Sequence, residues 1–433
     1  MVVSELVPWG PILLDKAKRS GVLRILIVSN LYPPHYLGGA ELLCKQIVDI
    51  LARQHEIRVL TSDFRLANSK DGDSSVPVSR SLKLYRAFGE DSQKPLLRRW
   101  PSKIADRRNS RTTKVVLKDF EPELVFVWSQ RRLGIGPALC AQRAGYPVAF
   151  IFNDDSASFF IPKRYPPGSL RSFLGFLLDH SLFRSNTTQA LDLGASSCIS
   201  QSLKTDMLAE GLPLSGSRVI HQGIPLSDFP CKAEPGSLGK PVRVLYVGQV
   251  LASKGVHTLL EAAELVAADR GPASIEVRIV GGGPEDYVEQ LRACNKSGYR
   301  LDLAGRIAHD ALPAVYRDHD IFVFPSIVKE GFGLTFLEAM ASGLPVIGTI
   351  TGGQGECLVD GVNALVFQAG DSAQLASCIL RLVDDADFRI GIAKAARAMV
   401  ERDYSLEVYA GKLEAFLEES RLGIKALQDP RAG

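Results

Sequence analysis

Two glutamates, Glu330 and Glu338, stand eight positions apart around a short glycine loop that reads Glu-Gly-Phe-Gly. An apolar run that predicts a strand comes just before the loop, and residues that predict a short helix come just after it. Free N–H groups and the helix dipole at such a helix start attract phosphate. With a carboxylate on each side of that phosphate site, the segment suits a ligand with hydroxyls on both sides of a diphosphate, which describes a nucleotide sugar.

The segment from Lys329 to Thr349 resembles the E-x7-E signature of the retaining glycosyltransferases of family 4, which have the GT-B fold. Its flanks match as well, because a strand ending in Pro325-Ser326 precedes it and a Gly-Leu-Pro-Val run lies at 343–346. On spacing alone, the alternative is a surface loop before a helix, with two solvated glutamates. The matched flanks favour the glycosyltransferase signature.

The resemblance implies a role for each polar group of this segment. Glu330 is expected to hold hydroxyls of the donor sugar and to steady charge at the anomeric centre. Glu338 is expected to bind the ribose hydroxyls. The remaining donor-binding residues of the loop are Phe332, Gly333, Leu334 and Thr335, and the amides of the last three are expected to stabilise the departing diphosphate.

A second glycine loop, from Gly248 to Gly255, resembles the Gly-Arg-Leu…Lys-Gly motif of the same family, whose Arg and Lys neutralise the phosphates of the donor. Lys254 matches this motif, whereas Gln249 occupies the position of the Arg. Glutamine donates hydrogen bonds but brings no charge, so Lys254 is expected to supply most of the positive potential. Without the resemblance, Lys254 would be an ordinary solvated lysine.

Two further turns are expected on the donor side. Gly38 and Gly39 follow the first predicted strand in a loop that looks like the Pro-Pro…Gly-Gly-x-Glu loop of the family, which lies over the donor diphosphate. The residues alone predict only a strand-to-helix connection there. Arg306 and Ile307 follow a later strand, in a turn that in the family lies near the nucleotide base.

The acceptor side is expected at Asn153 and Asp154, which follow a strand where many relatives have His-Asp. Because Asn153 replaces that histidine, a mechanism that uses the histidine as a proton acceptor is not expected here. His221 falls in a turn that the family writes as Asn-Gly-Ile/Val, and its expected role is that of a strand-end residue.

Strands and helices alternate in two series, and near-continuous apolar strands predict parallel sheets buried on both faces. The expected fold class is α/β: the GT-B fold, with two doubly wound, Rossmann-like domains that face each other across a ligand-binding cleft. Strands are predicted at 22–29, 55–61, 124–128, 147–152, 196–200, 218–221, 242–247, 275–280, 299–304, 321–324 and 346–349, and helices at 42–53, 256–269 and over most of 372–427.

Five segments are predicted along the chain. They are an N-terminal extension (1–21), an N-terminal acceptor-side domain (22–227), a Pro/Gly-rich linker (228–241), a C-terminal nucleotide-sugar-binding domain (242–405) and a C-terminal helix (406–433), which is a candidate to cross back to the N-terminal domain.

Composition indicates a soluble, globular, cytoplasmic protein. The 433 residues exceed one ordinary core, with 46% hydrophobic and 23% charged residues. No apolar run reaches about 18 residues, so no transmembrane helix is expected, and Glu5 and Asp15 interrupt what would be a signal peptide. Seven scattered cysteines without a C-x-x-C pair indicate reduced thiols and no zinc site. No motif suggests an essential metal or a cofactor.

The net charge of +3 is divided unevenly. Residues 1–240 carry 32 Lys+Arg against 22 Asp+Glu (+10), and residues 241–433 carry 19 against 26 (−7). The basic half is expected to face an anionic partner, with the inner face of the cell membrane as the candidate surface. The predicted docking cluster is Arg98 to Lys103 with Arg107, Arg108 and Arg111. An aromatic and basic stretch at 159–183 either lies in a membrane interface or packs on the N-terminal domain.

The resemblance therefore implies a retaining glycosyltransferase that moves a sugar from a nucleotide diphosphate sugar to a hydroxyl acceptor, with a lipid-linked acceptor as one candidate. A nucleotide-sugar epimerase of the same architecture is the first alternative, and product analysis would separate the two. A non-catalytic nucleotide-sugar-binding protein is the second, although intact Glu330 and Lys254 argue against it. Nucleic acid is not expected as a partner, because no basic-aromatic run resembles a known module.

Overall fold

The computed structural model describes residues 21–66, 72, 74–85, 99–155, 158, 161 and 188–428. Its contacts divide the chain into two compact units. Unit 1 contains the chain up to Ser197, residues 207–218 and the chain from Ala410 onward. Unit 2 contains Cys198–Asp206 and Val219–Tyr409. The domain limits predicted from the sequence stay a prediction.

Three of the sequence predictions fall largely on residues that the structure does not describe. The N-terminal extension 1–21 lies outside the described residues except for Gly21. So does the stretch 159–183, apart from Ile161. Of the basic cluster, Arg98 lies outside them, and described side chains begin at Asp106.

Unit 1 is built on a sheet of seven strands in the order β3-β2-β1-β4-β5-β6-β7. Neighbouring strands from β3 to β5 pair in parallel. Every residue of β4 and β5 is buried, which explains why their sequences are apolar throughout. The strands are β1 (Arg24–Ser29), β2 (Glu56–Ser62), β3 (Val78–Leu82), β4 (Leu124–Val127), β5 (Val148–Phe152), β6 (Ser196–Cys198) and β7 (Arg218–Val219).

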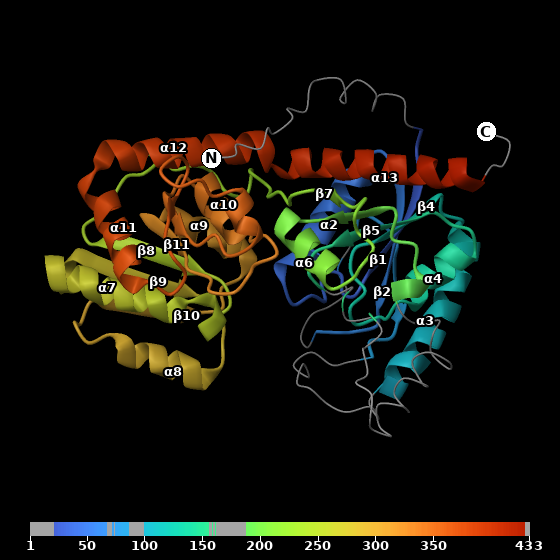
Figure 1. Cartoon of the computed structure of the whole chain (residues 1–433), viewed down its shortest axis with the longest axis horizontal. Helices are drawn as coiled ribbons and strands as arrows, with labels where there is room; N and C mark the ends of the chain where they lie inside the picture. The colour runs from blue at the N-terminus through green and yellow to red at the C-terminus, as the bar shows by residue number, and fades with distance from the viewer. Residues whose placement is uncertain are drawn as a thin grey trace. The chain divides into compact units, whose positions relative to one another are not determined.

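The helices of this part of the chain cover the sheet (Figure 1). They are α2 (Gly39–Leu51), α3 (Arg99–Phe120), α4 (Gly136–Arg143) and η6 (Thr188–Ala190). The next helix, α6 (Gln201–Ala209), belongs to unit 2 up to Asp206. α2 buries Leu43, Ile47 and Leu51, which recur every four residues and so line one helix face. α3 packs against α4.

The last helix, α13 (Leu406–Gln428), contributes its part from Ala410 onward to unit 1. Glu414 on this helix accepts a hydrogen bond from His55, with 3.0 Å between Oε1 and Nε2. Arg421 lies 3.8 Å from the carboxylate of Glu123, next to the start of β4. These contacts fasten the C-terminal helix to segments that come hundreds of residues earlier.

Unit 2 is built on a six-stranded sheet in the order β10-β9-β8-β11-β12-β13. All of its strand pairs are parallel. With its strands counted from β8, this is the 3-2-1-4-5-6 order of the Rossmann fold. The strands are β8 (Val242–Val247), β9 (Ile275–Val280), β10 (Arg300–Gly305), β11 (Ile321–Phe324), β12 (Val346–Gly348) and β13 (Leu365–Val366).

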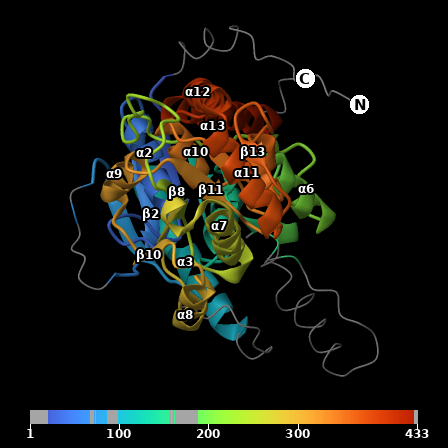
Figure 2. The same cartoon turned by 90° about the vertical axis from the view of Figure 1, so that its left-hand side faces the viewer.

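Helices lie on both faces of this second sheet, with α7 and α8 on one face and α9 and α10 on the other (Figure 1). α7 packs against α11, as Figure 2 shows, and α10 packs against α12. The helical segments are η7 (Ala252–Lys254), α7 (Val256–Arg270), η8 (Pro272–Ser274), α8 (Glu285–Cys294), η9 (His309–Ala311), α9 (Leu312–Arg317), α10 (Thr335–Ala341), η10 (Gly353–Glu356), α11 (Ser372–Asp384) and α12 (Ala386–Asp403).

Three features bear on the setting of the protein. Within the described ranges, no helix combines the length and the hydrophobicity that crossing a membrane requires. The seven cysteines are all described, and none forms a disulfide. The described side chains include no group of three or more His, Cys, Asp or Glu residues that could hold a metal ion.

Candidate functional site

The order of strands in unit 2 reverses between β8 and β11, and ligands of open parallel sheets bind at such a switch point, beyond the carboxyl ends of the strands. The loops that follow β8 and β11 meet there. The amides of Ile327 and Val328 donate to the carbonyl of Ser253 across 3.0 and 3.2 Å. The two glycine loops singled out in the sequence are thereby joined into one surface.

Lys254 and Glu330 form an ion pair at this switch point. Lys254 Nζ lies 2.5 Å from Glu330 Oε1, and the hydroxyl of Ser326 donates to the same oxygen across 2.6 Å. Both charged side chains are partly exposed, at 22% and 16%. One carboxylate oxygen is therefore held by two donors, while both charges stay accessible to solvent.

Close backbone approach explains why two loop positions are glycine. A Cβ on Gly255 would lie 2.0 Å from the carbonyl oxygen of Pro325, and the φ of Gly255 is +69°. A Cβ on Gly281 would lie 1.7 Å from the carbonyl oxygen of Gly248, and its φ is +144°. No other residue fits these sites without moving backbone, so the loops that carry the ion pair are tightly fixed.

Phe332 does not present its ring to the loop surface. The ring is 1% exposed and stacks on His221, with centroids 5.1 Å apart, and on Tyr404, at 5.8 Å. It also meets Phe336 edge-on at 6.0 Å. These aromatic contacts anchor the loop that carries Glu330, and they leave only the backbone of Phe332 for ligand contact.

A carboxylate secures these aromatic contacts. Glu356 accepts from His221 Nε2 across 2.8 Å and from the amides of Gln201 and Ser202 across 2.9 and 2.8 Å. Burial raises the pKa of the Glu356 carboxyl, but the hydrogen bonds from His221 and the two amides outweigh burial and lower that pKa. His221, expected only as a strand-end residue, is thus the link between Glu356 and Phe332.

Glu338 is turned into the interior of unit 2. Its side chain is 8% exposed, and the Tyr316 hydroxyl donates to Oε2 across 2.6 Å. Oε1 lies 4.0 Å from Nε2 of His309. Burial raises the pKa of the Glu338 carboxyl above its ordinary value. The neighbouring residues Gly333, Leu334 and Thr335 are half-buried at the start of α10.

Gln249, Arg306 and Ile307 follow β8 and β10. The carbonyl of Gln249 accepts from the Tyr246 hydroxyl across 2.8 Å, while its side chain is exposed. The guanidinium of Arg306 packs over Gly282, where a Cβ would lie 2.6 Å from Arg306 Nε. Arg306 is exposed and Ile307 is half-buried.

Unit 1 has its own switch point, between β1 and β4. Trp128 follows β4, and its Nε1 donates to the carbonyl of Ala40 in the first turn of α2, across 3.1 Å. Asn153 Nδ2 donates to the carbonyl of Trp128 across 3.0 Å. Gly39, which begins α2, is exposed, and nothing lies within 4 Å of the place a Cβ would take.

The entry to α2 also carries charge. The amide of Gly38 donates to Oε2 of Glu41 across 3.0 Å. Burial raises the pKa of the Glu41 carboxyl, and the negative charge of Asp154 raises it further. Within unit 1, the structure therefore brings the Gly38–Gly39 loop together with Asn153 and Asp154.

Sequence reasoning missed the residues that hold the two glutamates, Ser326 and Tyr316. Ser326 was visible as the end of a predicted strand four residues before Glu330. Tyr316 gave no signal, because it reaches Glu338 from α9, 22 residues earlier. Partners that tertiary packing supplies leave no local pattern.

Residues 241–385 match the family described as Glycosyl transferases group 1. This range holds both loops of the switch point in unit 2.

Two curated glycosyltransferases are similar to the chain. AmsK, an amylovoran biosynthesis glycosyltransferase of Erwinia amylovora, is 28% identical over 228 residues, which are 51% of this chain and 55% of that protein. The GDP-mannose-dependent alpha-(1-6)-phosphatidylinositol monomannoside mannosyltransferase of Mycobacterium tuberculosis is 31% identical over 190 residues, 42% of this chain and 48% of that protein. The chain spans about half the length of these relatives.

A solved structure shows a likeness of fold over most of the chain. HepE of Anabaena, crystallised in complex with UDP-glucose, superposes with a TM-score of 0.65 and 19% identity, covering 92% of this chain and 100% of that chain. The two Rossmann-like units and this neighbour confirm the predicted α/β GT-B fold.

Proposed function

We propose that the chain is a retaining glycosyltransferase of family 4, which moves a sugar from a nucleotide diphosphate sugar to a hydroxyl acceptor. One observation carries the proposal. Lys254 and Glu330 pair at the switch point of unit 2, inside the segment that matches group 1 glycosyltransferases. A cation and a carboxylate side by side suit a donor that carries a diphosphate next to sugar hydroxyls.

Two neighbours support a nucleotide-sugar donor. HepE was crystallised with UDP-glucose, and the mycobacterial relative is GDP-mannose-dependent. These donors differ in both base and sugar but share a diphosphate bonded to the anomeric carbon. The diphosphate is therefore the part of the donor that we assign to Lys254, together with Gln249 and the amides of Gly333, Leu334 and Thr335.

The reaction we propose depends on position and charge. On donor binding, the Lys254 ammonium shifts from Glu330 to the diphosphate oxygens, which frees Glu330 for the sugar hydroxyls and the anomeric centre. The bond between the anomeric carbon and the diphosphate oxygen breaks. The acceptor oxygen bonds to the same face of that carbon, and its proton passes to a diphosphate oxygen.

The remaining assignments follow the two switch points. In unit 2, Glu338 binds ribose hydroxyls through the small accessible part of its carboxylate, and Arg306 and Ile307 lie beside the base. In unit 1, Gly38 and Gly39 face the donor diphosphate. Asn153 and Asp154 orient the acceptor, as hydrogen-bonding groups rather than as a histidine base.

We further propose that the basic half of the chain docks reversibly on an anionic membrane, where a lipid-linked acceptor would be found. Arg107, Arg108 and Arg111 on α3 are the described members of the predicted docking cluster, and all three are at least partly exposed. Each cation near an anionic bilayer contributes about 1 kcal/mol. Flotation with anionic but not neutral vesicles, fading as salt rises, tests this location.

The test of function is a screen of nucleotide sugars. A true donor raises the melting temperature of the protein, because it binds only the folded state. Slow hydrolysis to free sugar and nucleoside diphosphate is expected without acceptor and in excess EDTA. An isomerised nucleotide sugar as product would instead show an epimerase, and stabilisation without turnover would show a binding protein.

A further inference from the structure

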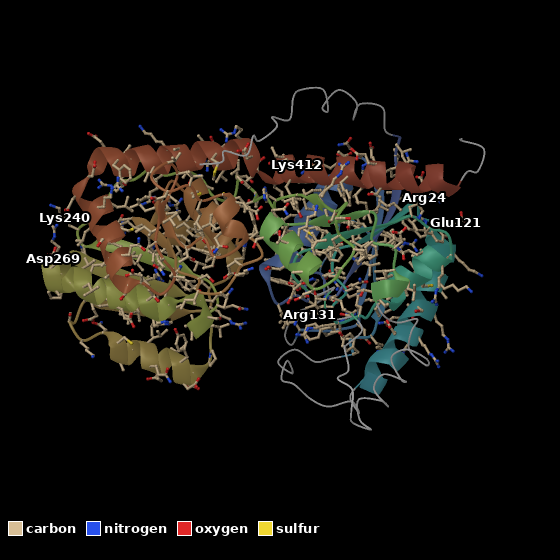
Figure 3. All side chains as sticks on the ribbon, in the orientation of Figure 1. Arg24, Glu121, Arg131, Lys240, Asp269 and Lys412 are labelled. Atoms are coloured by element: carbon tan, nitrogen blue, oxygen red, sulfur yellow. The ribbon has the colours of Figure 1, made fainter. Side chains whose placement is uncertain are left out.

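We propose a second ligand site, in unit 1, that binds a phosphomonoester or diphosphate group between α3 and α4. The structure has a cavity of about 550 Å³ there, lined by both helices. Four cations line it: Arg107, Arg111 and Lys114 from α3, and Arg143 from the last turn of α4. Figure 3 shows nitrogen-tipped side chains projecting from α3.

The spacing of the three cations on α3 puts them on one face of that helix. Arg111 follows Arg107 by four residues and Lys114 follows Arg111 by three, so successive turns carry like charges toward the same cavity. Like charges at this spacing repel each other and destabilise a helix. An anion bound between these cations offsets that repulsion, because each cation attracts it.

Among the described residues, none of the four cations forms an ion pair with a carboxylate. Other helices of the chain pair their cations at the same spacing. Lys45 lies 2.6 Å from Asp49 on α2, and Arg397 lies 2.6 Å from Glu401 on α12. The α3 face thus differs from these helices in presenting cations to a cavity rather than to acids.

Among the described residues that line the cavity, Asp106 is the one with a carboxylate, and that carboxylate accepts a hydrogen bond from the backbone. Asp106 is 6% exposed, and its Oδ1 accepts from the amide of Gly136 at the start of α4, across 2.7 Å. A Cβ on Gly136 would lie 2.7 Å from that oxygen, so the contact is close as well as buried. Asp106 joins the two helices, and the described lining residues carry four cations against this one carboxylate.

The wall between the cations is suited to a compact anion. Leu139, Ala144 and Cys140 form its less polar part, and the Cys140 thiol donates to the carbonyl of Ser110 across 3.3 Å. Burial raises the pKa of this thiol, so it stays neutral beside the cations. Guanidinium forks bind phosphate oxygens in pairs, and a phosphate offers three acceptors where a carboxylate offers two.

This site and diffuse attraction to a membrane predict different contributions from Arg108. Arg108 lies on the same helix, between two of the cations in sequence, is exposed, and does not line the cavity. If the attraction is diffuse, Arg108 and Arg111 contribute equally to binding. If the cavity is a phosphate site, Arg111 and Arg143 contribute more to binding than Arg108 does.

Calorimetric titration of the full chain with inorganic pyrophosphate tests the site. We expect Arg111→Gln and Arg143→Gln each to weaken binding at least about tenfold, the effect of losing one charge-assisted hydrogen bond. Arg108→Gln is the matched control and should change the affinity less than about twofold. Unchanged melting temperatures would show that the exposed substitutions leave the fold intact.

The proposed donor site can also bind pyrophosphate, and Lys254→Ala separates the two. If pyrophosphate still binds to the Lys254→Ala variant and this binding needs Arg111 and Arg143, the cavity site is supported, even if the proposed function is wrong. Binding that is lost with Lys254→Ala but unchanged by Arg111→Gln and Arg143→Gln overturns the cavity site and leaves the donor site standing. Equal losses for Arg108→Gln and Arg111→Gln also overturn it.

The source of the phosphate is distinguished by vesicles of phosphatidylcholine with and without phosphatidic acid, whose headgroup is a phosphomonoester. If Arg111→Gln reduces flotation with phosphatidic acid far more than Arg108→Gln does, the ligand is a lipid phosphate. If the two variants float alike while only Arg111→Gln loses pyrophosphate, the ligand is a soluble phosphate ester. Loss of neither property in Arg111→Gln contradicts the proposal.

Discussion

The sheets of the two units share the strand order 3-2-1-4-5-6, to which unit 1 adds a seventh strand, but their switch points are built differently. In unit 2 the loops after β8 and β11 are bridged by the ion pair of Lys254 and Glu330. In unit 1 the ends of β1 and β4 are bridged by hydroxyl and amide groups. Ser29 and Ser129 share a hydrogen bond of 3.1 Å, and the amide of Asn30 donates to the Ser129 hydroxyl across 3.0 Å.

The glycines at the two switch points also differ, in how closely other atoms approach them. In unit 2, backbone crowds Gly255 and Gly281, so these glycines are needed by the fold itself. In unit 1, nothing within 4 Å excludes a side chain at Gly39. A glycine that the fold does not require is explained if a ligand passes over it. The switch point of unit 2 is thus fixed by backbone contacts and an ion pair, whereas that of unit 1 is open at Gly39 and joined by neutral groups, with the carboxyls of Glu41 and Asp154 nearby.

Removing either charge of the ion pair should have the largest effect. We expect Glu330→Ala and Lys254→Ala each to lower turnover by about 10² to 10³, the cost of one strong transition-state contact. Both side chains are partly exposed, so melting temperatures should change little. Initial rates of donor hydrolysis and of transfer would measure this.

Ser326→Ala is the control for the ion pair, because it removes one donor to Glu330 but leaves both charges. A loss of about tenfold or less is expected. Wild-type turnover by a folded Glu330→Ala variant would end the assignment of Glu330 to the proposed donor site of unit 2.

The glycine contrast gives the next largest effect, on stability. Gly281→Ala should destabilise the protein by about 2 to 4 kcal/mol, because its Cβ meets backbone at a positive φ. Gly39→Ala at the start of α2 should keep or slightly raise stability, since Ala favours helix. Gly391→Ala, with open space on α12, is the helix control. Chemical denaturation measures all three.

Activity then tells why Gly39 is glycine. If the donor diphosphate lies over this loop, Gly39→Ala weakens donor binding severalfold with no loss of stability. Full donor affinity in Gly39→Ala would contradict the proposal that the donor diphosphate lies over this loop.

Much of this arrangement could be predicted from the sequence, because local patterns carry it. The strands β8, β9 and β11 begin and end at the predicted residues. They are buried apolar runs between glycine turns, which leave little choice of boundary. β3 and β13 were not predicted, because β3 is a partly exposed edge strand and β13 has only two residues.

The pairing inside the site was harder to predict for a physical reason. Motif spacing located Lys254 and Glu330 in separate loops, and only the strand order β8-β11 brings them within 2.5 Å. The burial of Phe332 and Glu338 follows from rings and hydroxyls that reach them from distant elements. A signature shows which residues occur at the site, but packing decides which of them face the ligand.

A smaller effect is expected at Asn153, which we propose to orient the acceptor. Asn153→Ala should raise the KM for the acceptor by about three- to tenfold, since one neutral hydrogen bond contributes about 1 kcal/mol. Donor hydrolysis should stay within about twofold of wild type, because the charges of unit 2 are untouched. Steady-state kinetics with and without acceptor would measure both. If Asn153→Ala lost as much donor hydrolysis as Glu330→Ala does, the proposed separation of acceptor binding in unit 1 from donor binding in unit 2 would be wrong.

The smallest effects concern two carboxylates of unit 2 that differ in their hydrogen bonds. Glu356 accepts from His221 and two amides, and its pKa is lowered, whereas the pKa of Glu338 is raised by burial. A lowered pKa means that the folded state releases the proton more readily than the unfolded state. Glu356 therefore stabilises the fold above its unfolded pKa, and this contribution is lost as pH falls through its folded pKa.

Glu338 has the opposite sign, because its folded state holds the proton more tightly. Its contribution is fully present below the unfolded pKa and is lost as pH rises through the folded pKa. Glu356→Gln should thus lower the free energy of unfolding by about 1 kcal/mol at pH 7, and by less as the pH falls through the folded pKa of Glu356. Glu338→Gln, which keeps an acceptor for Tyr316, should raise it by up to about 1 kcal/mol at pH 7 and by little at pH 3. Denaturant titrations at both pH values measure the pair, and two variants that respond with the same sign would show that burial, not hydrogen bonding, governs both carboxylates.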